Sequence, residues 1–351
     1  MPKGNANSME STIVANASVS EGPHDTPTRR WGIEYECLRK CNRQIPSQIS
    51  VYPEVFPHII EIITPTCGSI EEAKARLSSL LAQVRQHITL GEYAVYESQA
   101  PKVGIDDITG ANKVYYLWIL EDMYRFGGYV PEDFLIAGTH INYSNRLFSD
   151  DESILAAGLI RNYSWMLVTL GSNSPFMGGR ASGYLSSRTV FMPNRYDIPQ
   201  WHDFRHFLEW LEGEKRKGRI FRGKDRTWTP VCPRLHADRK SPSLNRIEIR
   251  SLDGGLGVTP ELIAGCCRLI ERLISTPPQI TAMPTPDEVR QNDFQAATRG
   301  QGAHITFDQK LIDSKALLRE YCEGIPVLEQ VLEEGNPAEQ ALVKFREGLN
   351  L

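Results

Sequence analysis

Charged and apolar residues alternate along several short segments of this chain, and that alternation limits what the chain can fold into. Side chains two residues apart on a β-strand share one face of the sheet. In the segment 31–38, WGIEYECL, Glu34 and Glu36 therefore point the same way. In the segment 58–65, HIIEIITP, two isoleucines can enter a core while Glu61 faces the opposite side. Both segments are predicted to be strands with carboxylates on one face.

Two later segments have the same pattern. The sequence GTHINYS places His140 and Asn142 on one face of a strand, and IEIRSL does the same for Glu248 and Arg250. A single glutamate on such a strand is usually a solvated residue, so the prediction depends on the whole set. If the four strands lie in one sheet, one surface gathers carboxylates, an imidazole and a guanidinium. Like charges this close need a cation, and hard oxygen ligands suit magnesium.

The remaining sequence mixes helical and strand patterns without a strict βαβα order. Besides the first two segments, strands are expected at 135–144, 186–192 and 246–252, and helices near 151–170, 201–217 and 260–275. Another helix is expected after Ser69, where Glu72 would complete a capping box. Its apolar stripe comprises Ile70, Ala73, Leu77, Leu81, Val84 and Ile88. Polar residues at every second strand position favour an α+β fold with a largely antiparallel sheet and one exposed, working face.

Composition divides the chain into three regions. Residues 1–30 are rich in Ser, Asn, Gly, Pro and Thr, and we expect a disordered leader. Residues 31–280 are expected to form the catalytic domain. A proline-rich hinge then leads into 281–351, where helical stretches near 309–321 and 337–349 are expected to pack on the main body.

Charge and composition exclude several classes of partner. The chain has 39 basic and 43 acidic residues, and this net charge of -4 disfavours nucleic acid and anionic lipid. No apolar run approaches the roughly 20 residues that cross a bilayer, so the expected compartment is the cytoplasm. The seven cysteines fit neither a disulfide framework nor a zinc CxxC spacing, and we expect reduced thiols.

Three other sequence patterns bear on the kind of site. No G-x-x-x-x-G-K-[ST] occurs, so a P-loop is excluded. The basic run 214–226 favours a solvated loop over a contact with RNA; a place over nucleotide phosphates is an alternative that only the family resemblance given below implies. The segment that begins at Trp201 has the spacing of a buried helix face, and its His202 and His206 lack the glutamate of a zinc HExxH motif.

Five segments together resemble the glutamate–cysteine ligase superfamily, which is related in fold to glutamine synthetase. They occur in the family's order and are GIEYECLR (32–39), IIEIITP (59–65), GTHINYS (138–144), LGSNSPFMGGRASGYLSSR (170–188) and IEIRSLD (247–253). The fourth is similar to the SSPF-x-x-GR-x-TGY-x-S-x-R segment of bacterial carboxylate–amine ligases. The resemblance implies a glutamine synthetase-like open cup with flanking helices and an antiparallel sheet as its floor.

The resemblance also implies site residues, cofactors and a reaction. Metal ligands for Mg²⁺, with Mn²⁺ possible, would be Glu34, Glu36, Glu61, His140 and Glu248. Acid or phosphate contacts would come from Arg188, Arg180, Glu54 and Asn142. Arg250 would face the transferred phosphoryl group, and Glu248 would act with it in catalysis. The implied reaction uses ATP to turn a carboxylate into an acyl phosphate, which an amine then attacks.

Some alternatives stay open from the sequence. The expected partners are a small acid and a small amine, amino acids in either a glutathione-type or a natural-product pathway, with a homo-oligomer as a possibility. A guanidino-kinase-type phosphotransferase shares the superfamily's fold and would phosphorylate without ligation. A non-catalytic relative would be expected to have lost at least one of the four metal-type glutamates, all of which are present.

Overall fold

A computed structural model describes residues 27–40, 51–108, 113–127, 135–191, 198–220, 229–236, 239–279 and 283–347. Its strands are β1 (Arg29–Leu38), β2 (Val51–Pro53), β3 (Ile59–Ile63), β4 (Gly138–Asn145), β5 (Phe176–Met177), β6 (Arg180–Ala181), β7 (Val231–Leu235), β8 (Leu244–Asp253), β9 (Ile305–Phe307) and β10 (Lys310–Ile312). Its α-helices are α1 (Ile70–Arg85), α2 (Lys113–Gly127), α3 (Asp150–Asn162), α4 (Ser164–Gly171), α5 (Ser187–Phe191), α6 (Phe204–Arg216), α7 (Pro260–Ser275), α8 (Pro286–Arg299), α9 (Ser314–Cys322), α10 (Pro326–Glu334) and α11 (Pro337–Arg346). Short 3₁₀ turns lie at Ile105–Asp107 and Gly300–Gly302.

Six of these strands form one sheet in the order β2-β3-β1-β4-β8-β7, and every neighbouring pair is antiparallel. The four segments with alternating charge are thus adjacent strands β3, β1, β4 and β8. The predicted α+β fold with a largely antiparallel sheet is confirmed.

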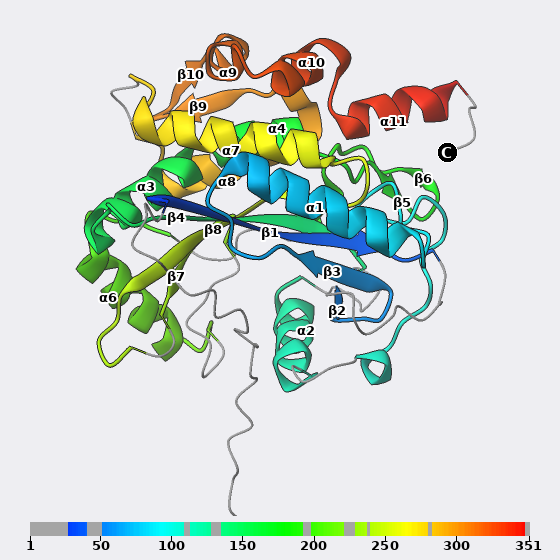
Figure 1. The fold of residues 1–351 in the computed structure, drawn as a ribbon, viewed down its shortest axis with the longest axis horizontal. Coiled ribbons are helices and arrows are strands. Elements are labelled where there is room, and N and C mark those ends of the chain that lie inside the picture. The colour runs from blue at the N-terminus through cyan, green and yellow to red at the C-terminus, as the bar shows by residue number, and fades with distance from the viewer. Residues whose placement is uncertain are drawn as a thin grey trace, which may run out of the picture.

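One face of this sheet is apolar and covered by helices. In β1 the odd-numbered side chains from Trp31 to Cys37 lie in the core, as do the isoleucines that flank Glu61 and Glu248. Helices α1, α3 and α4 contact this face, and α7 packs on α1 and α3. Figure 1 shows α1 and α7 on one side of the sheet and α2 on the other. The opposite face of the sheet therefore carries the polar residues.

A bulge breaks the alternation in β8. Thr139 pairs with Leu252, but Ile141 pairs with Ile249, so β8 has one extra residue opposite His140. Ile249 and Leu252 are three residues apart and both fully buried in the core. Without the extra residue Leu252 would point to the polar face, so the bulge keeps both the core and the polar face intact.

Helix α1 confirms the prediction at Ser69, with one difference. The hydroxyl of Ser69 accepts a hydrogen bond from the Glu72 backbone N–H at 3.1 Å. The Glu72 carboxylate, however, accepts from the N–H of Gly68 at 2.9 Å rather than from that of Ser69 itself. The predicted apolar stripe is buried, although Ile88 lies just beyond the end of the helix.

The C-terminal elements pack on the helical layer. α8 contacts α4, while α9 and α10 contact α7. The Asn336 side chain donates to the Thr169 carbonyl oxygen at 2.8 Å, and the Ala338 N–H donates to that of Ser172 at 3.1 Å. The family-like segments and the residues after the hinge are therefore joined by direct hydrogen bonds.

The predicted strand at 186–192 is wrong, because residues 187–191 form helix α5. The cause is local capping that propensity does not register. The Ser186 hydroxyl accepts from the Thr189 N–H at 3.1 Å and donates to a buried carboxylate oxygen of Asp253 at 2.9 Å. A residue held in this way starts a helical turn despite the β-branched residues that follow.

Other boundaries also differ from expectation. The helix predicted at 309–321 begins at Ser314, because Asp308 and Gln309 adopt positive φ angles of 51° and 62° and turn the chain between β9 and β10. The helix predicted near 151–170 is two helices that meet at Tyr163. Strands β2, β5, β6 and β7 and helices α2, α8 and α10 had no prediction, and β10 lies within the stretch predicted as a helix. The leader was expected to reach residue 30, but β1 begins at Arg29; residues 1–26 lie outside the described residues.

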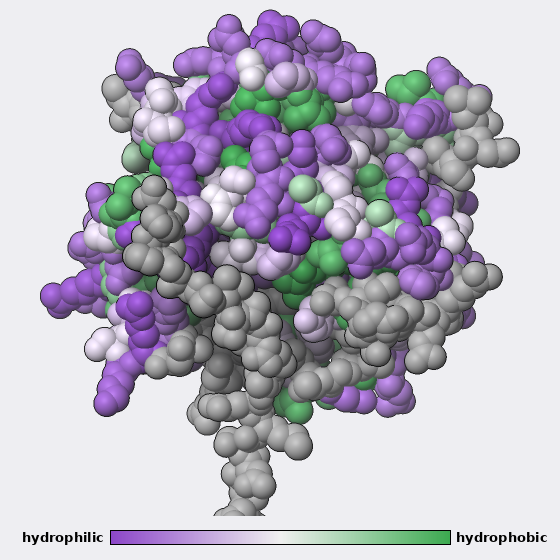
Figure 2. Space-filling model, in the orientation of Figure 1, coloured by the Kyte–Doolittle hydropathy of each residue, from purple (hydrophilic) through white to green (hydrophobic). Residues whose placement is uncertain are grey.

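The surface drawn in Figure 2 is mostly hydrophilic over the helical layer, with smaller hydrophobic areas among hydrophilic ones. None of the described helices has the length and apolar content that crossing a bilayer requires. Trp201 lies before helix α6 and is buried together with Phe207 and Leu211 of that helix, so core packing is confirmed for this segment.

We predict that Gly254→Ala destabilises the fold. A Cβ at this position would lie 2.4 Å from the Glu36 carbonyl oxygen and 2.8 Å from the Ala137 Cβ. Relieving that overlap requires movement of β1 or β4, at a cost of about 1–3 kcal/mol. The matched control is Gly213→Ala in α6, where a Cβ meets nothing within 4 Å and helix propensity should add about 0.5–1 kcal/mol. Urea unfolding of both variants measures whether each change lowers or raises the free energy of unfolding. Equal stabilities of the two variants would contradict the prediction.

Candidate active site

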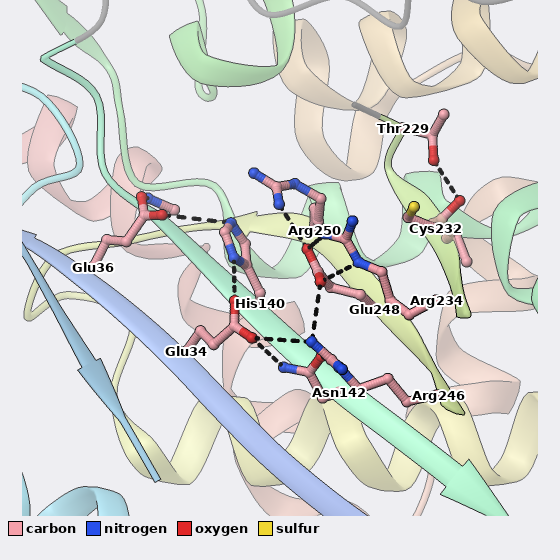
Figure 3. A network of polar contacts seen from close by, with 12 residues as sticks. Glu34, Glu36, His140, Asn142, Thr229, Cys232, Arg234, Arg246, Glu248 and Arg250 are labelled. Atoms are coloured by element: carbon pink, nitrogen blue, oxygen red, sulfur yellow. Dashed lines mark hydrogen bonds and ion pairs between the residues drawn. The ribbon is translucent and has the colours of Figure 1, made fainter. Parts of the chain in front are cut away.

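The strand register gathers the predicted polar residues on the uncovered face of the sheet. Glu36 pairs with Glu61 across β1 and β3, Glu34 pairs with His140 across β1 and β4, and Asn142 pairs with Glu248 across β4 and β8. Figure 3 shows side chains from β1, β4 and β8 converging on one another. We call the group Glu34, Glu36, Glu61, His140 and Glu248 the carboxylate cluster.

His140 lies at the centre of the carboxylate cluster, with 2% of its surface exposed. Its Nδ1 lies 3.2 Å from Glu34 Oε2, which as a carboxylate oxygen accepts, so Nδ1 carries the proton. Burial and the nearby Arg250 lower the pKa of His140 to about 4, so the ring is neutral at neutral pH. Its Nε2 therefore presents a lone pair, makes no hydrogen bond with a described residue, and lies 3.6 Å from Glu36 Oε1.

Glu36 and Glu61 lack cationic hydrogen-bond partners. Glu36 accepts from the Gly138 backbone N–H at 2.5 Å, whereas Glu61 has no hydrogen bond or ion pair among the described residues. Burial and repulsion by Glu54 raise the pKa of Glu36 to about 8. Burial and then repulsion, first by Glu54 and next by Glu34, raise the pKa of Glu61 to about 10. Without a cation, Glu36 and Glu61 therefore hold protons at neutral pH instead of an ionic partner.

The geometry fits a bound cation. The ligand atoms of Glu36, Glu61 and His140 lie within 4.8 Å of one another, and so do those of Glu34, His140 and Glu248. The two triads share His140. Several carboxylate oxygens with one imidazole nitrogen are a ligand set for Mg²⁺ or Mn²⁺, and the free lone pair on His140 supports that fit.

Glu248 differs, because arginines neutralise it. Its carboxylate accepts from Arg234 through both Nε, at 2.6 Å, and Nη2, and from Arg250 Nη1 at 2.6 Å. Burial would raise the pKa of Glu248, but Arg234 and Arg250 outweigh burial and hold it well below its ordinary range. The forked contact with Arg234 fixes the orientation of the carboxylate.

Asn142 links the two sides of the site. Its amide nitrogen donates to Glu34 Oε1 at 3.1 Å, and its amide oxygen accepts from Arg246 Nε at 2.6 Å. Arg246 also lies 3.9 Å from Glu34 and from Glu248. A substrate contact from Asn142 stays a prediction, because its polar atoms bond to the protein here.

Arg188 lies at the end of the site where β4 begins. Its guanidinium donates to the Arg250 carbonyl oxygen at 2.7 Å. A Cβ on Gly138 would fall 2.6–2.7 Å from that guanidinium, so only glycine leaves room for it. Gly138 also donates to Glu36, which places Arg188 directly beside the carboxylate cluster.

The other two predicted substrate or phosphate contacts, Glu54 and Arg180, lie at different distances from the carboxylate cluster. Glu54 follows β2 and accepts from the Tyr116 hydroxyl at 3.0 Å, close enough to raise the pKa of Glu36 and Glu61. Arg180 is exposed in the β5–β6 hairpin and is not part of the cluster. The roles of both residues stay predictions.

Comparisons with known proteins identify the family. Residues 34–349 match the profile of glutamate–cysteine ligase family 2, GCS2. The chain belongs to this family.

Individual GCS2 relatives are distant. The chain is 27% identical over 273 residues to a protein of Frankia alni that carries the provisional name glutamate–cysteine ligase 2-1, covering 73% of this chain and 66% of the relative. Similarly named proteins match from Herpetosiphon aurantiacus, 24% identical with 84% and 79% covered, and from Bdellovibrio bacteriovorus, 25% identical with 89% and 79% covered. The matched part thus spans just under two thirds of the Frankia relative.

Solved structures share the fold of this GCS2 member. The glutamate–cysteine ligase of Francisella tularensis in complex with AMP superposes with a TM-score of 0.62 at 14% identity, covering 92% of this chain and 86% of that one. A bifunctional glutathione synthetase from Pasteurella multocida gives a TM-score of 0.60 at 14% identity, covering 91% and 48%. At these identities the likeness concerns the fold alone.

Sequence reasoning missed Arg234 and Arg246. The alternation that predicted Arg250 also places Arg246 on the polar face, two residues before Glu248, so that signal was available. Arg234 could not be found in this way because β7 had no strand prediction. The basic run at 214–226 lies partly outside the described residues; within them, Lys217 and Arg219 pair with the buried Glu214 at 2.7 and 3.2 Å.

We predict that Arg234→Met lowers the free energy of unfolding by about 3 kcal/mol, because it leaves the buried charge of Glu248 with fewer partners. The matched control is Arg205→Met, since Arg205 is 87% exposed in its ion pair with Glu209. That change should stay within about 0.5 kcal/mol. Chemical denaturation of both variants measures the two changes in the free energy of unfolding. An equally small change for Arg234→Met would contradict a buried, forked ion pair between Arg234 and Glu248.

We also predict that Mg²⁺ binding releases protons and tightens as pH rises. With pKa values of about 8 and 10, Glu36 and Glu61 hold protons at neutral pH without a cation, and both must lose them to bind one. Affinity should therefore increase from pH 7 towards pH 10. Calorimetry in two buffers of different ionisation enthalpy counts the protons released. Glu61→Gln should release fewer and bind more weakly, whereas Glu333→Gln on the exposed face of α10 should match wild type. Affinity independent of pH would contradict the assignment.

Proposed function

We propose that this protein is an ATP- and magnesium-dependent carboxylate–amine ligase that forms an amide bond through an acyl phosphate. The observation that carries the proposal is the asymmetry of the site. One side has carboxylates and a histidine lone pair that call for cations, and the other side has arginines close to them. Family membership and the AMP in the Francisella structure support a nucleotide as the source of phosphate.

A carboxylate is a poor acyl donor, so ATP must first phosphorylate it. Phosphoryl transfer depends on positioning and on neutralising charge rather than on covalent help from the protein. Mg²⁺, when bound, would neutralise phosphate oxygens and orient them. We assign Glu34, Glu36, Glu61 and His140 to holding the cations.

The arginines take the complementary role. Arg250 is held by Glu248, which is itself held by Arg234, so its guanidinium is fixed before substrate arrives. We assign Arg250 to stabilising negative charge on the transferred phosphoryl group. Glu248 has both oxygens engaged by arginines, so we assign it first to orienting Arg250 and second to the triad with Glu34 and His140. Arg188 is assigned to the acid substrate or its phosphate.

A phosphotransferase of guanidino-kinase type is the alternative to exclude. Both activities release ADP, but only a ligase makes an acyl phosphate that hydroxylamine converts to a hydroxamate. The decisive assay is ADP release across a matrix of acids and amines with hydroxylamine added. ADP with no hydroxamate and no amide would overturn the ligase proposal. A non-catalytic relative would release no ADP with any pair.

Other expectations remain predictions. They are the cytoplasm as compartment, small acid and amine substrates such as amino acids, the absence of nucleic-acid and membrane partners, and a homo-oligomer.

We predict that Arg250→Lys lowers kcat roughly 10²- to 10³-fold, because lysine keeps one charge but loses the planar fork. The loss should appear in kcat more than in KM. Arg205→Lys on the exposed face of α6 is the control and should leave turnover unchanged. Glu248→Gln should slow turnover as well, but it also leaves Arg234 without its buried counter-charge, so its melting temperature must be compared first. Normal turnover in Arg250→Lys would remove Arg250 from the proposed mechanism.

A further inference from the structure

An apolar cavity of about 80 Å³ lies at the end of the sheet where β1 ends and β4 begins. Its apolar lining includes Leu135, Ile136, Phe176, Met177 and Phe191. The described lining residues carry no carboxylate, ammonium, guanidinium or imidazole group; the polar groups are two serine hydroxyls and the Tyr96 hydroxyl, which donates to the Arg39 carbonyl oxygen at 3.2 Å.

Helix α5 connects this cavity to the carboxylate cluster. Ser187 and Phe191 are four residues apart on α5, so they share the face that lines the cavity. Arg188 lies between them and crosses Gly138 to bond to the Arg250 carbonyl oxygen. Gly138 in turn donates to Glu36 at 2.5 Å. Arg188 and Gly138, the first residue of β4, therefore lie between the apolar cavity and the carboxylate cluster.

The apolar lining of this cavity favours an uncharged side chain over a charged one. An ionised side chain would lose its hydration there without gaining a partner of opposite charge, which is costly. An apolar side chain has no charge to desolvate, and its transfer from water into the cavity is favourable. The volume of about 80 Å³ is more than twice the roughly 30 Å³ that one water molecule occupies in the liquid, which suits a side chain of a few carbon atoms such as that of leucine or methionine.

A second cavity, of about 530 Å³, has the opposite character. It shares Val95, Tyr96 and Ser98 with the apolar cavity, but its lining includes Arg39, Lys40, His58 and Glu97. Lys40 lies 3.0 Å from Glu97. Charged groups of a substrate can therefore be accommodated next to the apolar cavity without entering it.

From this arrangement we infer that one of the two substrates, the acid or the amine, is an amino acid with a small apolar side chain, which occupies the apolar cavity. The inference rests on the proposed ligase function, because it assigns that side chain to a molecule reacting at the carboxylate cluster. It names a substrate class that glutamate, with its charged side chain, does not satisfy at this cavity.

The test uses the full chain with Mg·ATP and two substrate series, one varying the acid and one the amine. Each series compares leucine and methionine with aspartate and asparagine. The expected result is that in one series kcat/KM is at least about tenfold higher for the apolar members. Equal or better turnover of aspartate and asparagine in both series would overturn the inference while leaving the ligase proposal intact.

Two variants test whether the preference for apolar substrates arises at the apolar cavity. Ala100→Leu fills part of the cavity, and Met177→Asp puts a charge at its exposed rim, where Met177 is 48% exposed. Both variants should lower kcat/KM for leucine as substrate about 10- to 100-fold. Ala100→Leu should lower kcat/KM less for alanine as substrate, because the alanine side chain is smaller. The matched control is Met283→Asp, since Met283 is 64% exposed and does not line the cavity. An unchanged leucine preference in both cavity variants would overturn the assignment.

A failure of the proposed function is distinguishable from a failure of this inference. If no pair releases ADP or gives a hydroxamate, the ligase proposal fails, and calorimetric titration of leucine and aspartate still tests the cavity. Leucine binding that is lost in Ala100→Leu and retained in Met283→Asp would support the apolar site. Binding of neither amino acid, or equal binding of both, would overturn it.

Discussion

The arginines on the polar face of the central sheet gather around Glu248 and leave Glu36 and Glu61 without a cationic hydrogen-bond partner among the described residues, and the rest of the structure holds this uneven arrangement in place. On the β8 side, Glu248 is held by Arg234 and Arg250 and has its charge matched. On the β1 and β3 side, Glu36 and Glu61 face each other in register without a cationic partner among the described residues. Burying carboxyl groups this close together disfavours their charged form and raises their pKa values, and the arrangement persists only where other interactions hold the groups in place.

Those other interactions come from the opposite face and the strand ends. The core side chains of β1 alternate strictly with Glu34 and Glu36, so the carboxylates cannot turn away without exposing apolar surface. At the end of β1, the Glu36 carbonyl accepts from Gly255 N–H at 3.1 Å, and the buried Tyr35 hydroxyl donates to the Gly255 carbonyl at 2.6 Å. The backbone under the cluster is therefore fixed independently of the charges above it.

The same division explains how one face can serve several chemical tasks. In the proposed function, Glu36, Glu61 and the lone pair of His140 would hold a cation, while the arginines bound to Glu248 would form a preorganised anion site beside it. Preorganised charge avoids the cost of reorienting solvent when charge moves during a reaction. At the end of the sheet, two adjoining cavities have linings of differing polarity, which in the proposed function would discriminate between substrates without altering the charged centre.

The sequence by itself determined which side chains share a face. In Glu34 with Glu36, Glu61 between isoleucines, and Glu248 with Arg250, the period of two residues is a local property of a strand, and the structure follows it. Family resemblance added the roles expected of these residues, and the family itself is confirmed by comparison.

Only the tertiary structure decided which faces meet and which charges are neutralised. The fork of Arg234 on Glu248 joins residues 14 apart on neighbouring strands, one of which has no strand signal of its own. The bulge opposite His140 and the helix at 187–191 arise from pairing with distant residues, Thr139 and Asp253. Short-range periodicity contains no information about such contacts, because their energy is gained only when segments far apart in the chain are brought together.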